Sequence, residues 1–406
     1  MTMGPLDGVK VVEISSWMAA PSAGAVLADM GAEVVKIEPL AGDPVRNMSR
    51  KAKGAPDIDH SFHMDNRGKR SVAVAIDRPD GAELVRRLAD TADVFLCNLL
   101  PHRQERFGLE PATLHARNRR LVHATLSGYG REGPDVARPG FDVTTFFGRG
   151  AITDAMTEPG GVAPMPRPAQ GDHTTGIAMV AAVLAALRVA ERTGEGPVVD
   201  VSLFATAAWT MATDLAPTLV DGVPVRKRDR HHLITPLGNR FRCKDDRWII
   251  LNMPEVRWWP PFCKTIERPE LLEDERFGTV KDRFDNMPAL IDVLDEVMAT
   301  KTLAEWGQIL DDAGLIWGPA SSIHELAIDP QAAAIGLFPS VSHPDGDFRT
   351  VAAPMRIAGA DIRPRGPAPA LGADTADVLA GVGLTVDEIA ALAAAGIVGN
   401  GSPEPA

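Results

Sequence analysis

The N-terminal third of the chain alternates between short runs rich in Val and Ile and stretches with helical spacing. Residues 8–14 and 32–37 are β-branched runs on either side of a small-residue stretch, residues 19–30. This pattern predicts a strand, a helix and a second strand. The alternation continues with predicted strands at residues 71–76, 92–96 and 121–126 and predicted helices at residues 81–91 and 109–117. Because parallel strands need crossover connections, the pattern predicts an α/β domain with a parallel sheet.

The most apolar segment of the chain predicts a long helix. Residues 177–191 are apolar on nearly every side and end in a helix stop at residues 192–197, before a predicted strand at residues 198–203. We expect this helix to be buried in the fold. Its longest apolar run, residues 177–187, is too short to span a bilayer, and no basic and apolar leader opens the chain. We therefore expect no membrane partner.

The second half of the chain has a different texture. A charged segment at residues 225–232 precedes two predicted strands that flank a turn at residues 244–246. Predicted helices follow at residues 287–300, 303–313, 323–328 and 385–394. A smaller α+β domain is the natural interpretation of the hairpin and the helices next to it. The length of 406 residues allows two or three domains.

Charge and cysteine content exclude some classes of function. The net charge is -12, which disfavours nucleic acid as a partner. An anionic ligand must therefore be met by a local group of Arg and Lys. The three cysteines, Cys97, Cys243 and Cys263, lack a CxxC spacing, and one is left over in any disulfide scheme, so we expect a reducing cytoplasm. An NAD dehydrogenase is disfavoured because residues 16–25 lack a G-x-G-x-x-G motif and the helix is expected to start after Pro21.

Seven motifs occur along the chain in a characteristic order: residues 5–13, 31–38 with 42–43, 66–71, Asn98 with 106–109, 127–130, 171–172 and 192–196. Together they resemble the class III CoA-transferase family, also called the CaiB/BaiF family. This family includes formyl-CoA transferase and, as a divergent branch, α-methylacyl-CoA racemase. The similarity runs from about residue 5 to about residue 392.

The resemblance implies a Rossmann-like large domain, a small inserted domain and an interlocked homodimer. We expect a large domain at residues 1–216, a linker at 217–236 and the small domain at 237–318. A second linker at 319–335 leads to residues 336–398, which complete the large domain. Residues 399–406 are expected to be a disordered tail.

Asp172 is the predicted catalytic residue. It lies at or near the start of the long apolar helix, where the residue type alone favours a helix cap. The resemblance instead implies a nucleophile, because Asp172 falls where similar proteins keep their catalytic aspartate. The two roles are compatible. The neighbouring His173 is open to a structural or a solvent-facing role, since CoA transfer needs no proton abstraction.

The resemblance implies coenzyme A as the cofactor, carried by an acyl-CoA substrate, with a free carboxylic acid as acceptor and no metal. The CoA site needs cations at one end and an apolar channel at the other. The basic residues Arg67, Lys69 and Arg70 form a compact loop, and Arg106 follows Asn98 by eight positions. The predicted CoA-binding residues are Ser16, Trp17, Met18, Ala19, Lys69, Asn98, Leu99, Arg106 and Tyr129. For Tyr129, a buried packing role is the alternative.

The chain departs from the family pattern at two positions near the expected site. Met18 replaces the glutamine of formyl-CoA transferase, and a thioether cannot donate a hydrogen bond to a small dicarboxylate. Pro39 stands where that enzyme carries a cofactor-binding arginine.

Two other activities compete with CoA transfer. A racemase needs an acid and a base, but the chain has Phe141 between Gly140 and Asp142 where the racemase branch has histidine. A non-catalytic CoA-binding protein is disfavoured by the presence of Gly171 and Asp172. The residues of the acyl pocket are left unassigned by the sequence. The candidates are Trp17, Phe146, Phe147, Trp258 and Trp259, with ordinary packing as the alternative for each.

Overall fold

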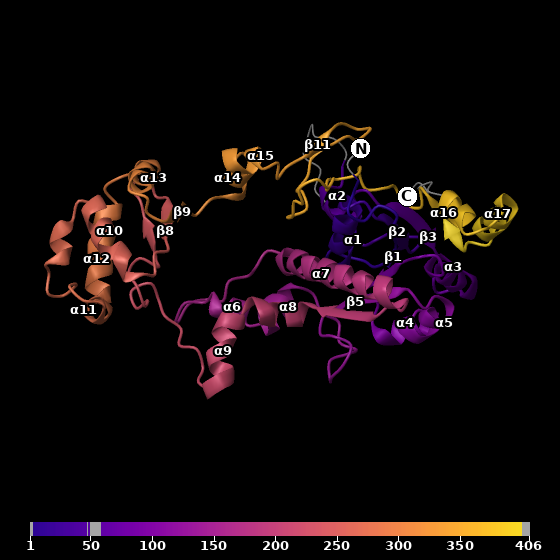
Figure 1. The fold of residues 1–406 in the computed structure, drawn as a ribbon, viewed down its shortest axis with the longest axis horizontal. Coiled ribbons are helices and arrows are strands. Elements are labelled where there is room, and N and C mark those ends of the chain that lie inside the picture. Colours follow the sequence, from indigo (N-terminus) through magenta and orange to yellow (C-terminus); the bar gives the residue numbers. More distant parts are fainter. Residues whose placement is uncertain (1–2, 47, 49–57, 400–406) are drawn as a thin grey trace. The chain divides into compact units, whose positions relative to one another are not determined.

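The computed structural model describes residues 3–46, 48 and 58–399. The chain forms two compact units, whose path can be followed in Figure 1. The first unit comprises Met1–Asp154, Pro164–Gly222 and Ala333–Ala406, and the second comprises Ala155–Ala163 and Val223–Ala332. The second unit therefore includes a short segment, residues 155–163, that the predicted boundaries placed in the large domain.

A seven-stranded sheet forms the centre of the first unit. Its strands are β1 (Lys10–Ile14), β2 (Glu33–Glu38), β3 (Arg70–Val74), β4 (Val94–Cys97), β5 (Val122–Ser127), β6 (Val198–Ser202) and β12 (Val398–Gly399). Their order is β12-β3-β2-β1-β4-β5-β6. The first six strands are parallel, as predicted, and β12 pairs antiparallel with β3. The parallel part has the strand order of doubly wound folds. Strands β2 and β3 lie on one side of β1, and β4, β5 and β6 lie on its other side, so the strand order reverses between β1 and β4.

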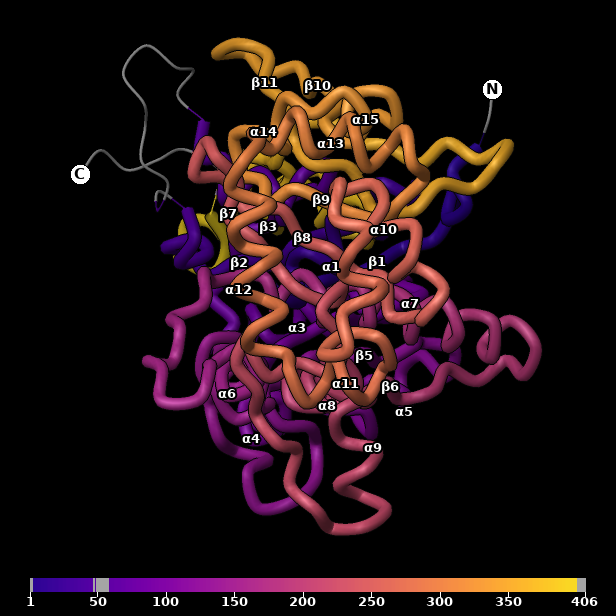
Figure 2. The backbone as a smooth tube through the Cα atoms, turned by 90° about the vertical axis from the view of Figure 1, so that its left-hand side faces the viewer, coloured from indigo at the N-terminus to yellow at the C-terminus, as the bar shows by residue number. Residues whose placement is uncertain are grey.

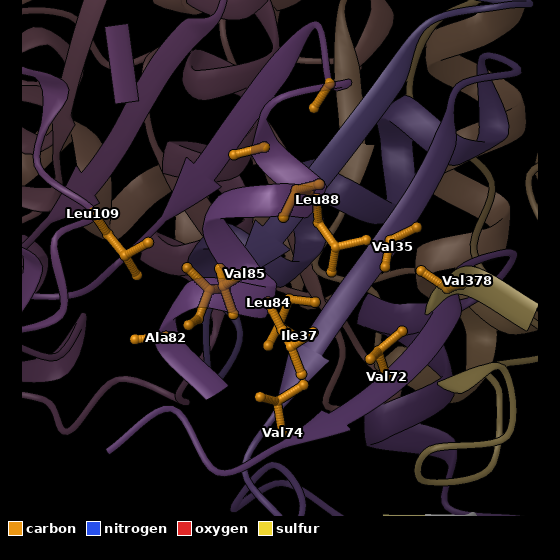
Figure 3. Close-up of a cluster of buried hydrophobic side chains, with 14 of the residues drawn as sticks. Val35, Ile37, Val72, Val74, Ala82, Leu84, Val85, Leu88, Leu109 and Val378 are labelled. Atoms are coloured by element: carbon orange, nitrogen blue, oxygen red, sulfur yellow. The ribbon is translucent and has the colours of Figure 1, made fainter. Parts of the chain in front are cut away.

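Alternating side chains of these strands supply two hydrophobic cores, one on each face of the sheet. Val11 packs into a core with α1 (Ala19–Asp29) and α7 (Gln170–Thr193). Val12 packs into the opposite core, with α3 (Pro79–Ala89), α5 (Pro111–Arg117), α16 (Thr375–Gly381) and α17 (Val386–Ala394). Figure 3 shows part of this second core, in which β2 and β3 side chains meet those of α3. A sheet buried on both faces explains the nearly continuous apolar runs of its strands.

The apolar helix α7 begins at Gln170, seven residues before the predicted start. It packs beside α1 (Figure 1), and Gly176 allows this because a Cβ there would lie 2.2 Å from Ser22 Oγ. Only one face of α7 is buried, so the prediction of a fully enclosed helix is wrong for the single chain. Among the described residues, α7 is also the one helix whose length and composition would suit a membrane span.

Further helices and a short hairpin complete the first unit. The helices are α2 (His60–Asn66), α4 (Pro101–Phe107), the π-helix η1 (Val143–Arg149), α6 (Ile152–Ala155), α8 (Leu203–Thr210) and α9 (Ala212–Asp221). The boundary between the units falls within α15 (Pro330–Ala334), and the hairpin is formed by β10 (Ser340–Val341) and β11 (Phe348–Arg349). Two predictions are corrected here. Helix α1 begins at Ala19 rather than after Pro21, and Gly399, which was assigned to the disordered tail, pairs with Ala73 in the sheet. Residues 400–406 lie outside the described residues.

The second unit contains the predicted hairpin and helices. Strands β7 (Arg240–Arg242), β8 (Trp248–Leu251) and β9 (Trp317–Pro319) form an antiparallel sheet. The helices are η2 (Val256–Trp258), α10 (Trp259–Thr265), η3 (Pro269–Leu272), α11 (Val280–Asp285), α12 (Met287–Met298), α13 (Leu303–Asp312) and α14 (Ile323–Ala327), and their path can be followed in Figure 2. The sheet and α10, α12 and α13 share one hydrophobic core, which makes this unit an α+β structure.

Candidate active site

The site lies where two adjacent parallel strands end. β1 and β4 pair through their last residues, Ile14 and Cys97. Ser16 follows the end of β1 by two positions, and Asn98 directly follows β4. The Asn98 side chain donates to Ser16 O at 2.7 Å and accepts from Ser16 N at 3.2 Å. In open α/β sheets, ligands bind outside the carboxyl ends of strands at such a reversal of strand order.

Trp17 has an unusual backbone conformation at this point. Its φ angle is 70°, in the left-handed region that a bulky residue rarely adopts. The Trp17 N–H donates to Asp43 Oδ1 at 3.4 Å, and the Ser16 bonds to Asn98 hold the preceding residue. Such strain persists where the surroundings impose it, often at functional sites.

A cavity of about 380 Å³ opens at this edge of the sheet. Its walls come from the ends of β1, β4 and β5, from the loop before η1, and from the first turn of α7. The lining residues are Ser16, Trp17, Ala19, Pro44, Asn98, Leu99, Leu100, Arg103, Leu126, Ser127, Gly128, Pro139, Gly140, Phe141, Asp172 and Leu203. Arg103 and Asp172 are the two charged side chains among them.

Asp172 is the third residue of α7, and its side chain is 9% exposed. The N-cap is Ala169, with φ 76°, and it makes no side-chain cap bond, so Asp172 is not the capping residue. The preceding Gly171 is required by packing, since a Cβ there would lie 2.6 Å from the Phe146 ring. Gly171, at the start of the helix that carries Asp172, is thus packed against an aromatic ring.

The surroundings of Asp172 favour the protonated carboxyl. Burial raises its pKa to about 7, the neighbouring Asp142 and Asp65 add to the rise, and His173 opposes it. Asp142 is 3% exposed, and its Oδ2 has no hydrogen-bond partner in the described part of the chain. Two carboxyl groups that share a desolvated site disfavour each other's charge.

His173 turns away from the sheet toward α2. Its Nε2 lies 3.0 Å from Asp65 Oδ1, and Asp65 is 2% exposed. Burial lowers the pKa of the imidazole, but the hydrogen bond to Asp65 and the charges of Asp65 and Asp172 raise it above its ordinary value. The two groups are thus coupled, since the charge of Asp172 raises the pKa of His173 and the charge of His173 lowers the pKa of Asp172.

A larger cavity of about 710 Å³ lies elsewhere in the first unit, and its polar side chains are already engaged. Arg46 pairs with Glu38 at 2.7 Å, and Asp43 pairs with Lys36 at 2.9 Å. His63 Nδ1 accepts from Ala368 N at 3.0 Å. The cavity with Asp172 is therefore the better candidate for chemistry, although it is smaller.

The amino-acid sequence matches the model of CoA-transferase family III over residues 6–375. The chain belongs to this family. Its sequence is 33% identical to the (R)-2-hydroxy-4-methylpentanoate CoA-transferase of Clostridioides difficile, over 95% of the chain and 97% of that protein. It is 31% identical to the cinnamoyl-CoA:phenyllactate CoA-transferase of Clostridium sporogenes, over 94% of each protein.

Solved structures agree with this family membership. The crystal structure of Rv3272 from Mycobacterium tuberculosis superimposes with a TM-score of 0.83 at 32% identity, over 93% of this chain and 99% of that one. A CaiB/BaiF family protein from Brucella suis gives 0.82 at 29% identity, over 94% and 100%. The chain is thus an enzyme of the CoA-transferase type, and the racemase alternative is not favoured.

Six of the predicted site residues of this family III CoA-transferase line one cavity. These are Ser16, Trp17, Ala19, Asn98, Leu99 and Asp172. They come from three segments far apart in the sequence, which the parallel sheet and α7 bring together. The cavity that they line lies at the carboxyl ends of the strands, the edge of the sheet at which the sequence analysis expects a ligand.

The basic loop before β3 is not available to a ligand. Lys69 is buried, and its Nζ pairs with Glu13 and donates to Pro21 O and Asn66 Oδ1. Arg67 is 2% exposed and pairs with Asp29 at 2.7 Å. Arg70 is bound at the surface to Glu33 and Asp374. The predicted role of Lys69 in CoA binding therefore has no support in this geometry.

Three other predicted residues lie outside the wall of the cavity. Met18 points into a small core with Val45, Phe62 and Ala368. Tyr129 is partly buried between aromatic and cationic side chains, with the Arg149 guanidinium 4.9 Å from its ring centroid. Arg106 is exposed at the end of α4, over the Phe107 ring.

Arg103 is a cavity-lining residue that the sequence analysis missed. It lies one helical turn before Arg106 and lines both this cavity and an adjoining one of about 100 Å³. Neither Arg103 nor Arg106 forms an ion pair within the described residues. The available signal was the spacing of three residues, which places both side chains on one face of a helix.

The aromatic candidates for an acyl pocket separate into two groups. Trp17 lines the cavity, together with Phe141, which the analysis had considered only as a replaced histidine. Phe146 and Phe147 are buried in a core with Leu203. Trp258 and Trp259 belong to the core of the second unit, so for these four residues packing is the role seen.

Proposed function

We propose that this enzyme moves CoA from an acyl-CoA to a free carboxylic acid through a covalent aspartyl-CoA thioester on Asp172. The single observation that carries this proposal is the position of Asp172. Its carboxyl lines a cavity at the reversal of strand order, is almost shielded from water, and accepts no hydrogen bond from the described residues. A purely structural carboxylate with that burial would be expected to have donors around it.

The proposed transfer consists of four exchanges at carbonyl carbons. The Asp172 carboxylate attacks the acyl-CoA carbonyl, which forms a mixed anhydride and releases CoA thiolate. The thiolate attacks the aspartyl carbonyl, which releases the first acid and leaves aspartyl-CoA. The second acid attacks aspartyl-CoA to form a new anhydride and thiolate. The thiolate then attacks the new acyl carbonyl, which yields the product thioester and restores the carboxylate.

The surroundings of Asp172 support this chemistry in two ways. A carboxylate whose conjugate acid has a raised pKa is a better nucleophile than an ordinary one, while it is still ionised near neutral pH. The first intrahelical bond of α7 is donated by His173 N to Ala169 O, so the N–H groups before it lack acceptors within the helix. These N–H groups are available to a developing oxyanion.

The two adjoining cavities suit the two ends of CoA. The cavities of about 380 Å³ and 100 Å³ share Ser16, Asn98, Leu99 and Arg103, while Asp172 lines only the first of them. We place the thioester beside Asp172 and the nucleotide toward the smaller cavity. Pro39 lines that smaller cavity and offers no cation. We therefore assign binding of the CoA phosphates to Arg103 and Arg106, whose charges are unpaired within the described residues.

The acceptor is proposed to be a carboxylic acid, as in the named relatives, which transfer CoA to or from acids such as 2-hydroxy-4-methylpentanoate and phenyllactate.

We also propose a cytoplasmic homodimer. The outward face of α7 exposes apolar side chains such as Val189, and α9 buries none of its residues, so a second copy has apolar surface to cover. Light scattering in solution should give twice 43.3 kDa.

Intact mass spectrometry tests the covalent intermediate. The enzyme is incubated with a panel of acyl-CoAs, without acceptor acid, and quenched with acid. A mass increase equal to CoA minus water is expected, and it should disappear on adding an acceptor acid or hydroxylamine. Asp172→Ala should bind CoA but give neither adduct nor transfer, while Asp377→Asn, an exposed carboxyl on α16, serves as control. Full transfer by Asp172→Ala would overturn the proposal.

A further inference from the structure

Two large aromatic side chains face the cavity beside Asp172. The rings of Trp17 and Phe141 lie edge to face, with centroids 5.2 Å apart and an interplanar angle of 88°. Trp17 is 39% exposed and Phe141 is 50% exposed. Edge-to-face contact is a favoured geometry for aromatic rings, so the pair has one defined arrangement rather than two independent ones. Both residues line the cavity of about 380 Å³ that contains Asp172, and neither lines the adjoining cavity of about 100 Å³.

Contacts of the neighbouring backbone hold both residues of the aromatic pair in place. Trp17 is fixed in its left-handed conformation by the Asp43 contact, and Asn98 fixes Ser16 on the other side. On the Phe141 side, the neighbouring Gly140 packs against Gly128, where a Cβ on either residue would lie within 3.1 Å of the other's backbone. Exposed apolar surface on a rigid frame beside a reactive group is the usual form of a binding wall.

The charges of the cavity indicate which ligands this wall excludes. Arg103 is the one cation among the lining residues, and it belongs to the part shared with the smaller cavity. Around Asp172 the groups that interact with its charge are Asp142, Asp65 and His173, and His173 is already bound to Asp65. Among the lining residues, the cavity therefore offers a second carboxylate on a substrate no cation other than Arg103, at the end shared with the smaller cavity.

We propose that Trp17 and Phe141 bind the side chain of the acyl group, and that the enzyme selects monocarboxylic acids with a bulky apolar or aromatic side chain over dicarboxylic acids. This inference rests on the proposed function, because it assumes that the acyl carbonyl lies at Asp172. It gives Phe141 a role in specificity, where a histidine would have been needed for proton exchange.

Acceptor competition tests the inference. With one acyl-CoA donor held constant, kcat/KM is measured for 3-phenylpropanoate, glutarate and acetate. We expect 3-phenylpropanoate to exceed glutarate by about a hundredfold, since it gains apolar burial and avoids an unpaired buried charge. Equal or better use of glutarate would overturn the inference. If none of the acids accepts CoA from any donor, the proposed function itself fails.

Variants of Phe141 separate a binding role from a general effect on the site. Phe141→Ala should lower kcat/KM for 3-phenylpropanoate by about tenfold or more and change that for acetate by less than about threefold. Phe141→Leu should retain most of the activity, and Phe284→Ala, an exposed phenylalanine of α11, is the matched control. Equal losses for both acids in Phe141→Ala would also overturn the inference, provided that its melting temperature is unchanged.

Discussion

The Nζ atom of Lys69 lies 2.7 Å from Glu13 Oε2, and both side chains are completely shielded from solvent. Lys36 joins the same group, at 3.4 Å from Glu13 and 2.9 Å from Asp43. Asp43 in turn accepts from Trp17 N, so this buried ionic network reaches the wall of the cavity. Residues that carry the family resemblance thus hold the loop after β1.

Lys69→Met should destabilise the protein. The substitution leaves Lys36 as the one cation facing two buried carboxylates, Glu13 and Asp43. An uncompensated buried charge typically costs about 3 to 5 kcal/mol. Urea unfolding measures the loss. Arg70→Met, which breaks half-exposed pairs one residue away, should cost about 1 kcal/mol or less. A folded Lys69→Met with normal stability and much weaker CoA binding would instead restore the predicted contact with CoA.

Arg103→Ala should weaken binding of acyl-CoA. Charge-assisted bonds to phosphate are among the strong ones, so KM for acyl-CoA is expected to rise by about tenfold or more. An acyl-pantetheine substrate, which lacks the nucleotide, should be used equally well by both proteins. Arg188→Ala, an exposed arginine on α7, is the control. Equal losses with both substrates would assign Arg103 to the thioester end.

Sequence patterns predicted the parallel sheet because strands and helices differ in the spacing of their apolar residues and because the β-branched runs are short. They also predicted that Ser16 and Asn98 lie close together, since both follow the ends of parallel strands, and the two residues line one cavity. They gave no sign of the ion pair between Lys69 and Glu13, because a lysine that binds phosphate and one that pairs with a buried carboxylate look the same in a sequence. They missed Arg103 and Phe141, whose positions depend on a short helix and a loop without periodic pattern.

Transfer activity should fall in acid. The carboxylate of Asp172 is the reactive form, and burial raises its pKa to about 7. In the free enzyme, kcat/KM for acyl-CoA should therefore decrease about tenfold for each pH unit well below 7. A pH profile with a non-titrating donor measures this. A flat profile down to pH 5 would contradict the raised pKa.

The same raised pKa should make stability depend on pH. The native state binds the proton more tightly than the unfolded state, so the contribution of Asp172 is most favourable below pH 4 and is lost as pH rises to about 7. Three pKa units correspond to ~4 kcal/mol. Asp172→Asn should therefore melt at a higher temperature than the native protein at pH 8, and the two should converge near pH 4. A variant that is less stable at pH 8 would contradict this sign.

His173 should tune Asp172 through its charge. The imidazole is bound to Asp65 and lowers the pKa of Asp172, so His173→Gln should move the acid limb of the kcat/KM profile to higher pH, by on the order of one unit. His173→Lys retains a cation and should leave the limb closer to its original position. Because a merely structural histidine would change the melting temperature without moving the limb, the pH profile of the two variants separates charge from packing. An unmoved limb in His173→Gln would leave burial and Asp142 as the forces that set the reactivity of Asp172.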